Sequence, residues 1–279
     1  MYVFILETVM VNERIYLDPA DEQVYIDTYV ADNQTFLHDA ILVIPGGGYY
    51  SVCTAREGEP IALSYMAKGY NAFVLNYRVN KVPYPAQIID ASRAILHIRE
   101  NAEKYSIDPK RVFAVGFSAG GHLAGSLATL HNEPDVLSAL GIDEGANRPD
   151  GVVLGYPVVS AMYPTHHGSF INLCGGKEFQ DITDEEKKKL SLEYHVNEKS
   201  APAYIWHTAE DTVVPPIGSL VLAAEYVKAG VPVKMNLYPY GAHGVALGNE
   251  ITANNKDTWR QPLAVGWVDD SVAFFNTLK

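Results

Sequence analysis

Residues 111–130 read RVFAVGFSAGGHLAGSLATL, and this stretch indicates the fold more strongly than any other. It begins with an apolar run typical of a buried strand and ends with a run of small and apolar residues typical of a helix. Between the two runs, residues 116–120 form a Gly-x-Ser-x-Gly pattern, in the strand, turn and helix context that this pattern requires. The glycines leave room for a sharp turn that would raise the hydroxyl of Ser118 above the sheet. Ser118 is therefore a candidate nucleophile, and the alternative is a serine that only caps the helix.

Strand-like and helix-like segments alternate along the chain from residue 40 onward. Apolar runs typical of strands lie at residues 40–45, 71–78, 151–159, 203–211 and 233–244, and helical patterns lie at 56–69, 85–105 and 267–278. This alternation predicts a mostly parallel sheet with helices on both faces. Residues 9–30 hold two runs that alternate apolar and polar side chains, so we expect an antiparallel start to the sheet. In such sheets the functional loops follow the carboxyl ends of the strands.

The composition is that of one globular domain, which we expect to span residues 1–279. Of the residues, 48% are apolar and 19% are charged, so disorder is not expected. The net charge of −12 disfavours phosphate backbones and anionic lipids, so neither nucleic acid nor a membrane surface is expected as a partner. The two cysteines, Cys53 and Cys174, form neither a disulfide framework nor a zinc motif.

The N-terminal run MYVFILETVMV is interrupted by Glu7, and it has neither a basic leading segment nor a small-residue cleavage site. It is therefore interpreted as a strand rather than as a signal peptide. No stretch of about 20 apolar residues occurs, so no membrane-spanning helix is expected. These features predict a cytoplasmic protein.

A serine hydroxyl is a weak nucleophile and needs an adjacent base, which in this arrangement follows an acidic residue later in the chain. His243 stands in a glycine-flanked loop, YGAHG, after the last expected strand, where its imidazole could reach the nucleophile. Asp211 opens the loop after residues 203–210 and could fix the tautomer of that imidazole. Glu210 is the alternative for this role, and Asp211 could instead cap the next helix.

Other histidines are weaker candidates for the base. His122 lies four positions after the serine within the following helix, so we expect a packed, hydrogen-bonded side chain. His207 lies within an expected strand and should pack as well. The pair His166-His167 has no third ligand at metal spacing, which favours a structural or substrate-side role over a metal site.

Three consecutive glycines, residues 46–48, follow the strand-like run of residues 40–45. Their backbone N–H groups have no side chains in the way, and a tetrahedral reaction intermediate needs two or three such donors around its oxyanion. The N–H group of Ala119, directly after the candidate nucleophile, should complete the set. A phosphate-binding loop is the alternative, but no Lys-Ser/Thr pair follows the glycines.

These stretches resemble the α/β-hydrolase superfamily, and more narrowly its bacterial acetyl-esterase and acetylxylan- or feruloyl-esterase-like proteins. The resemblance is carried by IPGGGYYSVCTAREGEPIALSYMAKGY, FVLNYRV, GFSAGGHLAG, HTAEDTVVPP and GAHGVAL, which are spread from about residue 41 to residue 247. Related lipases usually carry a histidine before the three glycines. In this chain Pro45 stands there, as it often does in the acetylxylan-esterase-like branch.

The resemblance implies an α/β-hydrolase fold with a mostly parallel eight-stranded sheet, an antiparallel N-terminal start and helices on both faces. It implies a serine carboxylesterase that hydrolyses short-chain acyl esters, with acetyl esters of carbohydrates as one substrate class and no metal or organic cofactor. By the family pattern, Ser118, Asp211 and His243 form a catalytic triad. The residues that the same pattern assigns to the oxyanion hole are Gly47, Gly48 and Ala119.

Neighbouring residues have supporting roles in this interpretation. Arg56, Glu57 and Glu59 are interpreted as an ion-pair and helix-start cluster that supports the glycine loop. Four tyrosines are candidates for lining the pocket: Tyr49, Tyr50, Tyr77 and Tyr156. Of these, Tyr49 and Tyr156 are the candidate substrate-binding residues.

The role of residues 160–200 stays open. This irregular stretch includes the charged run DITDEEKKKL and forms either a small lid over the site or a surface loop and helix. A homodimer is common for such folds, but no unambiguous exposed apolar stripe supports one. The expected partner is a small-molecule ester. The alternatives are an amidase or peptidase on the same triad, and a non-catalytic binding protein.

Overall fold

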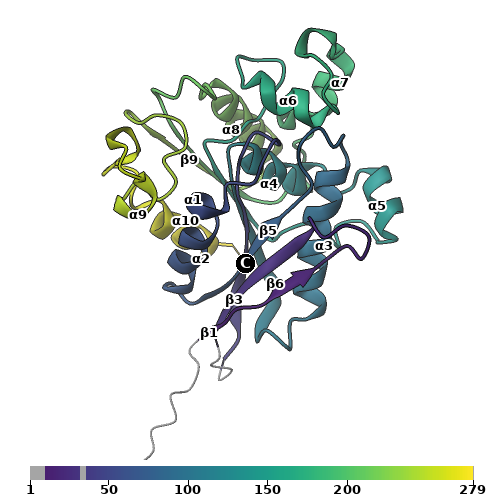
Figure 1. Cartoon of the computed structure of the whole chain (residues 1–279), viewed down its shortest axis with the longest axis vertical. Coiled ribbons are helices and arrows are strands. Elements are labelled where there is room, and N and C mark those ends of the chain that lie inside the picture. The colour runs from purple at the N-terminus through teal and green to yellow at the C-terminus, as the bar shows by residue number, and fades with distance from the viewer. Residues whose placement is uncertain (1–9, 32–35, 279) are drawn as a thin grey trace, which may run out of the picture.

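A nine-stranded sheet forms the centre of the protein (Figure 1). The computed structural model describes residues 10–31 and 36–278. The strands are β1 (Met10–Val11), β2 (Arg14–Tyr16), β3 (Tyr25–Ala31), β4 (His38–Ile44), β5 (Tyr70–Asn76), β6 (Ile107–Phe117), β7 (Val152–Gly155), β8 (Ala203–Thr208) and β9 (Val233–Tyr238). Their order in the sheet is β1-β3-β5-β4-β6-β7-β8-β9, with β2 beside β3.

The predicted α/β class and the antiparallel start are confirmed, and the sheet has nine strands within the described residues where eight were expected. Strands β4 to β9 run parallel to one another, whereas β1 and β2 pair antiparallel with β3, and β3 with β5. The first expected run, residues 10–18, is interrupted between β1 and β2. There the N–H group of Glu13 donates to the side chain of Thr28 at 2.9 Å. Residues 1–9, where the sequence predicts a strand, lie outside the described residues.

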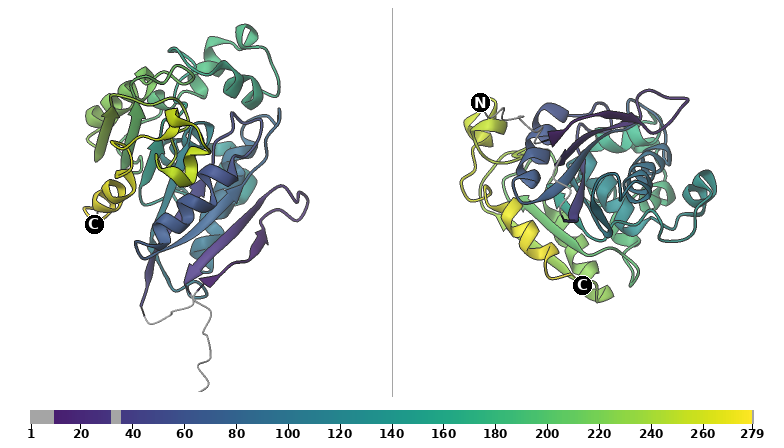
Figure 2. Two further views of the ribbon diagram at one scale, coloured as in Figure 1. Left: turned by 60° about the vertical axis from the view of Figure 1, so that its left-hand side comes forward. Right: turned by 90° about the horizontal axis from the view of Figure 1, so that it is seen from below.

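Helices cover both faces of the sheet (Figure 1, Figure 2). They are α1 (Thr54–Glu57), α2 (Glu59–Met66), α3 (Ala86–Glu100), α4 (Ala119–Thr129), α5 (Pro134–Leu140), α6 (His167–Leu173), α7 (Asp184–Lys189), α8 (Ile217–Ala229), α9 (Glu250–Ala253) and α10 (Trp267–Phe275). In β4, Leu42 and Ile44 face the core that α3, α4 and α8 cover, while Ile41 and Val43 face the core under α2 and α10. Because both faces of the parallel strands are buried, their sequences are continuous apolar runs.

Helix α3 is shorter than the helical pattern of residues 85–105 predicts. It ends at Glu100, and the side chain of Asn101 donates to the carbonyl group of His97 at 2.8 Å. Tyr105, which fits the helical spacing, still packs into the core from the following turn and is 3% exposed. The apolar spacing therefore marks the buried side correctly, but not the end of the helix.

The loops that carry the candidate site residues follow the carboxyl ends of parallel strands. The glycine loop follows β4, Ser118 follows β6, Asp211 follows β8 and His243 follows β9. Because the carboxyl ends of parallel strands meet at one edge of a sheet, segments from all over the chain converge there.

Residues 160–200 contain α6 and α7 and lie between β7 and β8. The two helices lie together at one end of the molecule (Figure 1, Figure 2). Helix α7 begins with a capping box, in which Thr183 and Glu186 each bond the backbone of the other. Hydrogen bonds that involve side chains tie the segment to the rest of the protein, and two of them lie near the site. Asn172 donates to the carbonyl group of Gly48 at 3.0 Å, and the carbonyl group of Leu190 lies 2.7 Å from Nε2 of His122.

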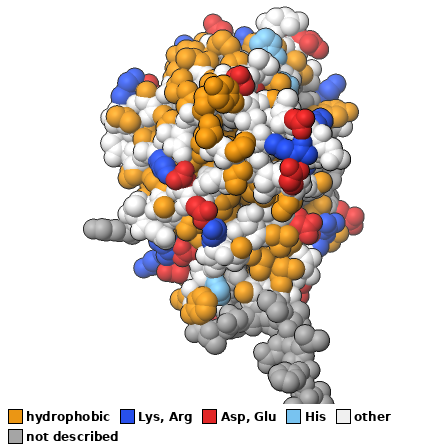
Figure 3. Space-filling model, turned by 90° about the vertical axis from the view of Figure 1, so that its left-hand side faces the viewer, with side chains coloured by type: hydrophobic (Ala, Val, Ile, Leu, Met, Phe, Trp, Pro, Cys, Tyr) orange, Lys and Arg blue, Asp and Glu red, His pale blue; other side chains and the backbone are white. Residues whose placement is uncertain are grey.

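The face on the β9 side mixes apolar and charged side chains (Figure 3). Apolar side chains run down its middle, and acidic and basic side chains lie close to one another beside them. Nothing on this face identifies a partner, so the homodimer stays a prediction. Within the described ranges, none of the helices combines the length and the apolar character that a membrane span requires.

Candidate active site

Ser118 stands at the sharp turn between β6 and α4. Its φ of 54° lies in the left-handed region, which is strained for a residue with a side chain. The turn is possible because the two flanking glycines have no Cβ atom. A Cβ on Gly116 would lie 2.1 Å from the carbonyl oxygen of Gly120, and one on Gly120 would lie 2.2 Å from that of Ile44. The Gly-x-Ser-x-Gly pattern therefore has a steric cause in this fold.

The structure brings Ser118, His243 and Asp211 together in one hydrogen-bonded chain. Nε2 of His243 lies 2.9 Å from Oγ of Ser118, and its Nδ1 lies 2.6 Å from Oδ2 of Asp211. Because an ionised carboxylate only accepts, Nδ1 carries the proton and Nε2 can accept from the serine hydroxyl. Ser118 is 8% exposed and the side chain of His243 is 18% exposed, so a small ligand can reach both.

Asp211 is buried, and its hydrogen bonds stabilise the charged carboxylate. Oδ1 accepts from the N–H groups of Val213 and Val214, both at 2.9 Å. Oδ2 accepts from His243, and from His207 at 3.2 Å. Burial alone would raise the pKa of Asp211, but the hydrogen bonds from His207 and His243 outweigh it and hold the pKa well below its usual range. The carboxylate is therefore charged at neutral pH.

Glu210, the alternative acid, does not reach the imidazole. Its side chain is exposed, and Oε2 accepts from the N–H group of Gly241 at 3.2 Å.

His207 is buried as predicted, but its contact with Asp211 was not predicted. Nε2 of His207 lies 2.9 Å from the carbonyl oxygen of Val214, and Nδ1 lies 2.8 Å from Oγ of Ser219. Since a carbonyl group only accepts, Nε2 carries the proton and also donates to Asp211. The one signal in the sequence is the spacing of four residues between His207 and Asp211 across the end of a strand.

The N–H groups expected to form the oxyanion hole are those of Gly47, Gly48 and Ala119. In the part of the chain that the structure describes, the backbone N–H groups of Gly47, Gly48 and Ala119 make no hydrogen bond. Gly47 has a φ of +129°, and a Cβ there would lie 2.0 Å from the carbonyl oxygen of Ser51. Ala119 is the first residue of α4, where backbone N–H groups carry partial positive charge. Such donors can bind a negatively charged oxygen.

A cavity of about 300 Å³ opens onto Ser118 and His243, and Gly47 and Gly48 line it as well. His166 and Asn172 form part of its wall and come from residues 160–200. Some of this segment therefore borders the site rather than lying only on the outer surface.

The structure corrects the expectation that Tyr49 and Tyr156 bind substrate. The two residues are 2% and 1% exposed, and neither is among the described residues that line the cavity. Tyr49 donates to Nδ1 of His122 at 2.8 Å, and Tyr156 packs edge-on against His243 with ring centroids 5.1 Å apart. The adjacent Tyr50 is 65% exposed and lines the cavity as expected, whereas in the described part of the chain Tyr77 is buried and does not line it.

The expected ion-pair cluster around Arg56 is not formed. Within the described ranges, Arg56 donates to backbone carbonyl groups rather than to a carboxylate. Glu59 is exposed. Glu57 supports the glycine loop as predicted, because its Oε2 accepts from the N–H group of Gly46 at 2.8 Å.

His122 is buried and hydrogen-bonded, which confirms the prediction that it packs within the helix. Its Nε2 donates to the carbonyl group of Leu190 at 2.7 Å, so its Nδ1 accepts from the hydroxyl of Tyr49. Burial lowers the pKa of His122 from 6.5 to about 4. The imidazole is therefore neutral at pH 7.

Acid is expected to destabilise the fold through His122. Between pH 6.5 and about 4, the unfolded chain binds a proton at this residue and the folded chain does not, so the free energy of unfolding falls as the pH drops through this range. The shift from 6.5 to about 4 corresponds to a loss on the order of 3 kcal/mol. Urea unfolding of the native chain and His122→Gln at pH 7 and pH 4 measures it. The variant should lose less stability between the two pH values, and an equal loss would contradict the assignment.

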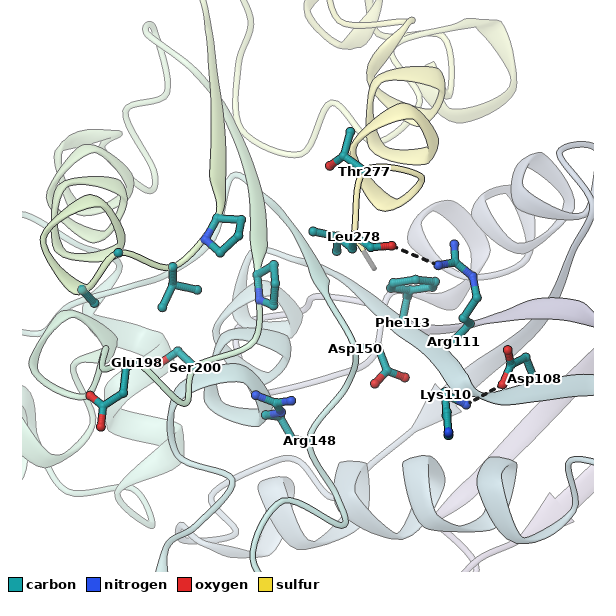
Figure 4. A pocket seen from close by; sticks show the side chains of 15 residues that line it. Asp108, Lys110, Arg111, Phe113, Arg148, Asp150, Glu198, Ser200, Thr277 and Leu278 are labelled. Atoms are coloured by element: carbon teal, nitrogen blue, oxygen red, sulfur yellow. Dashed lines mark hydrogen bonds between the residues drawn. The ribbon is translucent and has the colours of Figure 1, made fainter.

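A larger hollow, of about 680 Å³, lies away from these residues (Figure 4). It sits at the amino ends of β6 to β9, and Figure 4 shows Phe113 beside Leu278 with the charged side chains of Arg148 and Asp150 around them. Functional loops in such sheets follow the carboxyl ends of the strands. The smaller cavity at Ser118 is therefore the candidate active site.

His166 and His167 have different environments. His166 bonds Oγ of Ser169 through Nδ1 at 2.9 Å and borders the cavity, whereas His167 stacks on Phe179 with ring centroids 3.7 Å apart. Across residues 10–31 and 36–278, no three or more His, Cys, Asp or Glu side chains are grouped so that they could hold a metal ion.

The sheet order, the helices on both faces and the sharp turn at Ser118 define an α/β-hydrolase fold. The structure is similar to that of MGS-M1, an α/β hydrolase from a Medee basin deep-sea metagenome library, with a TM-score of 0.77 and 33% identity over 96% of this chain and 98% of that chain. Residues 26–226 match the family model BD-FAE, and the chain belongs to this family. The resemblance to esterase-like α/β hydrolases is thereby confirmed.

Two further relatives have named activities. Endo-1,4-beta-xylanase B of Butyrivibrio fibrisolvens is 40% identical over 227 residues, which are 78% of this chain and 34% of that protein. The chain therefore spans about a third of the length of this curated relative. An acetyl ester-xyloside bifunctional hydrolase from Caldicellulosiruptor lactoaceticus has a similar structure, with a TM-score of 0.76 and 34% identity over 94% of this chain and 97% of that chain.

Proposed function

We propose that the protein is a serine carboxylesterase that hydrolyses short-chain acyl esters. The observation that carries this proposal is the hydrogen-bonded chain from Ser118 through His243 to Asp211, at 2.9 and 2.6 Å, beside a cavity of about 300 Å³. It supports nucleophilic catalysis, because the Asp211 carboxylate is charged and Nδ1 of His243 carries the proton. Nε2 of His243 is therefore free to accept the proton of Ser118.

In the first half of the proposed reaction, His243 accepts the proton of Ser118 as Oγ attacks the ester carbonyl carbon. The carbonyl oxygen becomes an oxyanion, which the N–H groups of Gly47, Gly48 and Ala119 stabilise. The tetrahedral intermediate then expels the alcohol, which takes the proton from His243 and leaves an acyl-serine. In the second half, water attacks the acyl group by the same route and the carboxylic acid leaves.

Acetyl esters of carbohydrates are the substrate class that we favour. The structural relative from Caldicellulosiruptor lactoaceticus is described as an acetyl ester-xyloside bifunctional hydrolase, which supports this class. The cavity also offers polar side chains, His166 and Asn172, that suit an alcohol with several hydroxyl groups. Their position supports the interpretation of residues 160–200 as a cap. A small-molecule ester as ligand, a cytoplasmic location and a homodimer stay predictions.

A glycosidase is the second candidate, because the xylanase relative is 40% identical over 227 residues. Glycoside hydrolysis generally uses two carboxyl groups roughly 5 to 9.5 Å apart on either side of the bond. Among the described residues that line the cavity, Glu57 has the one carboxylate. Its two oxygens already accept from Gly46 at 2.8 Å and from Tyr156 at 2.7 Å. The site therefore favours ester hydrolysis.

Hydrolysis of p-nitrophenyl acetate, butyrate and octanoate tests the proposal. We expect the fastest turnover with acetate, and a kcat/KM that falls by on the order of 10-fold or more toward octanoate, because a small cavity rejects added methylene groups. The matched amide, p-nitroacetanilide, should react far more slowly, and equal rates would favour the amidase. Turnover of p-nitrophenyl xyloside without turnover of any ester would favour the glycosidase. The esterase proposal fails if no ester is hydrolysed.

A further inference from the structure

The loop that carries His243 is held in place by side chains from other parts of the chain. Within it, Gly244 has a φ of +83° and Ala246 a φ of +52°, which is strained for a residue with a side chain. The hydroxyl of Tyr156 accepts from the N–H group of Ala246 at 3.0 Å, and Nε1 of Trp267 donates to its carbonyl group at 2.8 Å. The loop therefore depends on outside partners for its conformation.

Arg56 and Trp259 hold the part of this loop that carries the imidazole. Nη2 of Arg56 donates to the carbonyl group of Gly244 at 2.5 Å, and its Nε donates to that of Thr252 at 2.9 Å. Nε1 of Trp259 donates to the carbonyl group of His243 itself at 2.8 Å. The guanidinium of Arg56 lies 3.5 Å from the centroid of the Trp259 ring, so each side chain restricts the other.

The guanidinium group is suited to this task. Its planar fork of N–H groups can bind two carbonyl oxygens at once, which an ammonium group does less well. In the described part of the chain, the hydrogen bonds of the Arg56 side chain go to carbonyl groups, so no carboxylate competes for its charge. Hydrogen bonds from a charged donor are stronger than those between neutral groups.

The short helix that carries Arg56 is itself bonded to the glycine loop. The next residue of α1, Glu57, is 4% exposed, and its Oε2 accepts from the N–H group of Gly46 at 2.8 Å. Its Oε1 accepts from the hydroxyl of Tyr156 at 2.7 Å, and this hydroxyl also binds Ala246. Two adjacent residues of α1 therefore contact the loop with the oxyanion donors and the loop with the base.

We propose that Arg56 is a positioning residue, which fixes the loop of His243 relative to the glycine loop. The proposal rests on the proposed esterase function, because it takes His243 as the base. Arg56 and Trp259 both line the cavity at Ser118. The hydrogen bonds of the guanidinium go to the backbone of Gly244 and Thr252, so the role proposed for Arg56 is exerted through this backbone and the ring of Trp259. A misplacement of about 1 Å can cost about 100-fold in rate. Loss of Arg56 should therefore lower kcat rather than raise KM.

Kinetics of Arg56→Gln, Arg56→Lys and Lys256→Gln with p-nitrophenyl acetate test the proposal. Lys256 is the matched control, because its Nζ lies 4.0 Å from the same Trp259 ring but has no hydrogen bond to the loop in the described structure. We expect Arg56→Gln to lower kcat by about 10- to 100-fold with KM within about threefold, and Arg56→Lys to recover part of the loss. Lys256→Gln should match the native chain. Titration with an organophosphonate measures the concentration of active sites in each sample. Dividing the rate by this concentration gives kcat per folded molecule, so partial unfolding does not appear as a lower kcat.

Hydrogen–deuterium exchange gives a second readout that needs no turnover. Amides of residues 243–247 should exchange about 10-fold faster in Arg56→Gln than in the native chain or Lys256→Gln, while those of β6 keep their rate. Unchanged exchange with unchanged kcat would overturn the proposal. A higher KM at unchanged kcat would also overturn it, since Arg56 would then contact the substrate. If the native chain hydrolyses no ester, the proposed function fails, and the exchange rates alone decide whether Arg56 holds the loop.

Discussion

Replacement of Ser118 by alanine is expected to lower kcat for p-nitrophenyl acetate by on the order of 10⁶-fold, as is typical when a catalytic serine is removed. Alanine lacks the attacking oxygen, while the N–H groups of Gly47 and Ala119 stay in place. Some acceleration over water should therefore survive. In the described structure Oγ of Ser118 bonds only His243, so the free energy of unfolding should change by no more than about 1 kcal/mol.

Ser64→Ala is the matched control for this substitution. Oγ of Ser64 bonds the carbonyl group of Pro60 at 2.8 Å within α2, away from the cavity, so this variant should keep its kcat. Labelling by an organophosphonate, followed by mass spectrometry, should disappear in Ser118→Ala and persist in the control. Turnover that survives in Ser118→Ala at close to the native rate would exclude Ser118 as the nucleophile.

Replacement of Asp211 by asparagine has the next largest expected effect, a loss of about 10⁴-fold in kcat. The N–H groups of Val213 and Val214 both bind Oδ1, so the amide oxygen must take that place and the amide nitrogen must face His243. An amide nitrogen only donates, so the proton of His243 would move from Nδ1 to Nε2. This tautomer cannot accept the proton of Ser118.

Steady-state kinetics of Asp211→Asn beside Glu210→Gln measures this effect. Glu210 is exposed and accepts only from Gly241, at 3.2 Å in the described structure, so its variant should keep a kcat close to native. Asp211→Asn should also unfold more easily, because its amide nitrogen would face the N–H group of His207, donor against donor. A near-native kcat in Asp211→Asn would contradict the orienting role.

The parts of the site that could be predicted from the sequence are those that local geometry dictates. The turn at Ser118 excludes a Cβ at Gly116 and Gly120, so the pattern of residues 116–120 is enough to predict the turn. The positions of Asp211 and His243 could be predicted because loops after late parallel strands must meet at one edge of the sheet. The alternation of strands and helices predicted the class, but not the interruption between β1 and β2.

Contacts between distant segments could not be predicted. Arg56 donates to the carbonyl group of Gly244, which lies 188 positions further along the chain. No local sequence pattern at either residue predicts this contact. Tyr49 and Tyr50 are the same residue type, but the side chain of Tyr49 is buried and that of Tyr50 is exposed. Which way each side chain points depends on the left-handed backbone at Tyr49, whose φ is 56°. Hydrophobic periodicity assumes regular strands and helices, so it cannot show which of two adjacent tyrosines in a loop is buried.

Residues 160–200, which contribute His166 and Asn172 to the cavity wall, are tied to the rest of the protein at several points. Asn172 bonds the carbonyl group of Gly48 at 3.0 Å, Leu190 bonds His122 at 2.7 Å, and the N–H group of Leu192 donates to Val159 at 3.1 Å. These hydrogen bonds oppose a movement in which the whole segment swings aside as one hinged flap. We therefore expect substrates to enter through the existing mouth of the cavity and to be selected by shape without a closing movement. Turnover would then be limited by bond making or by diffusion, and not by a gate.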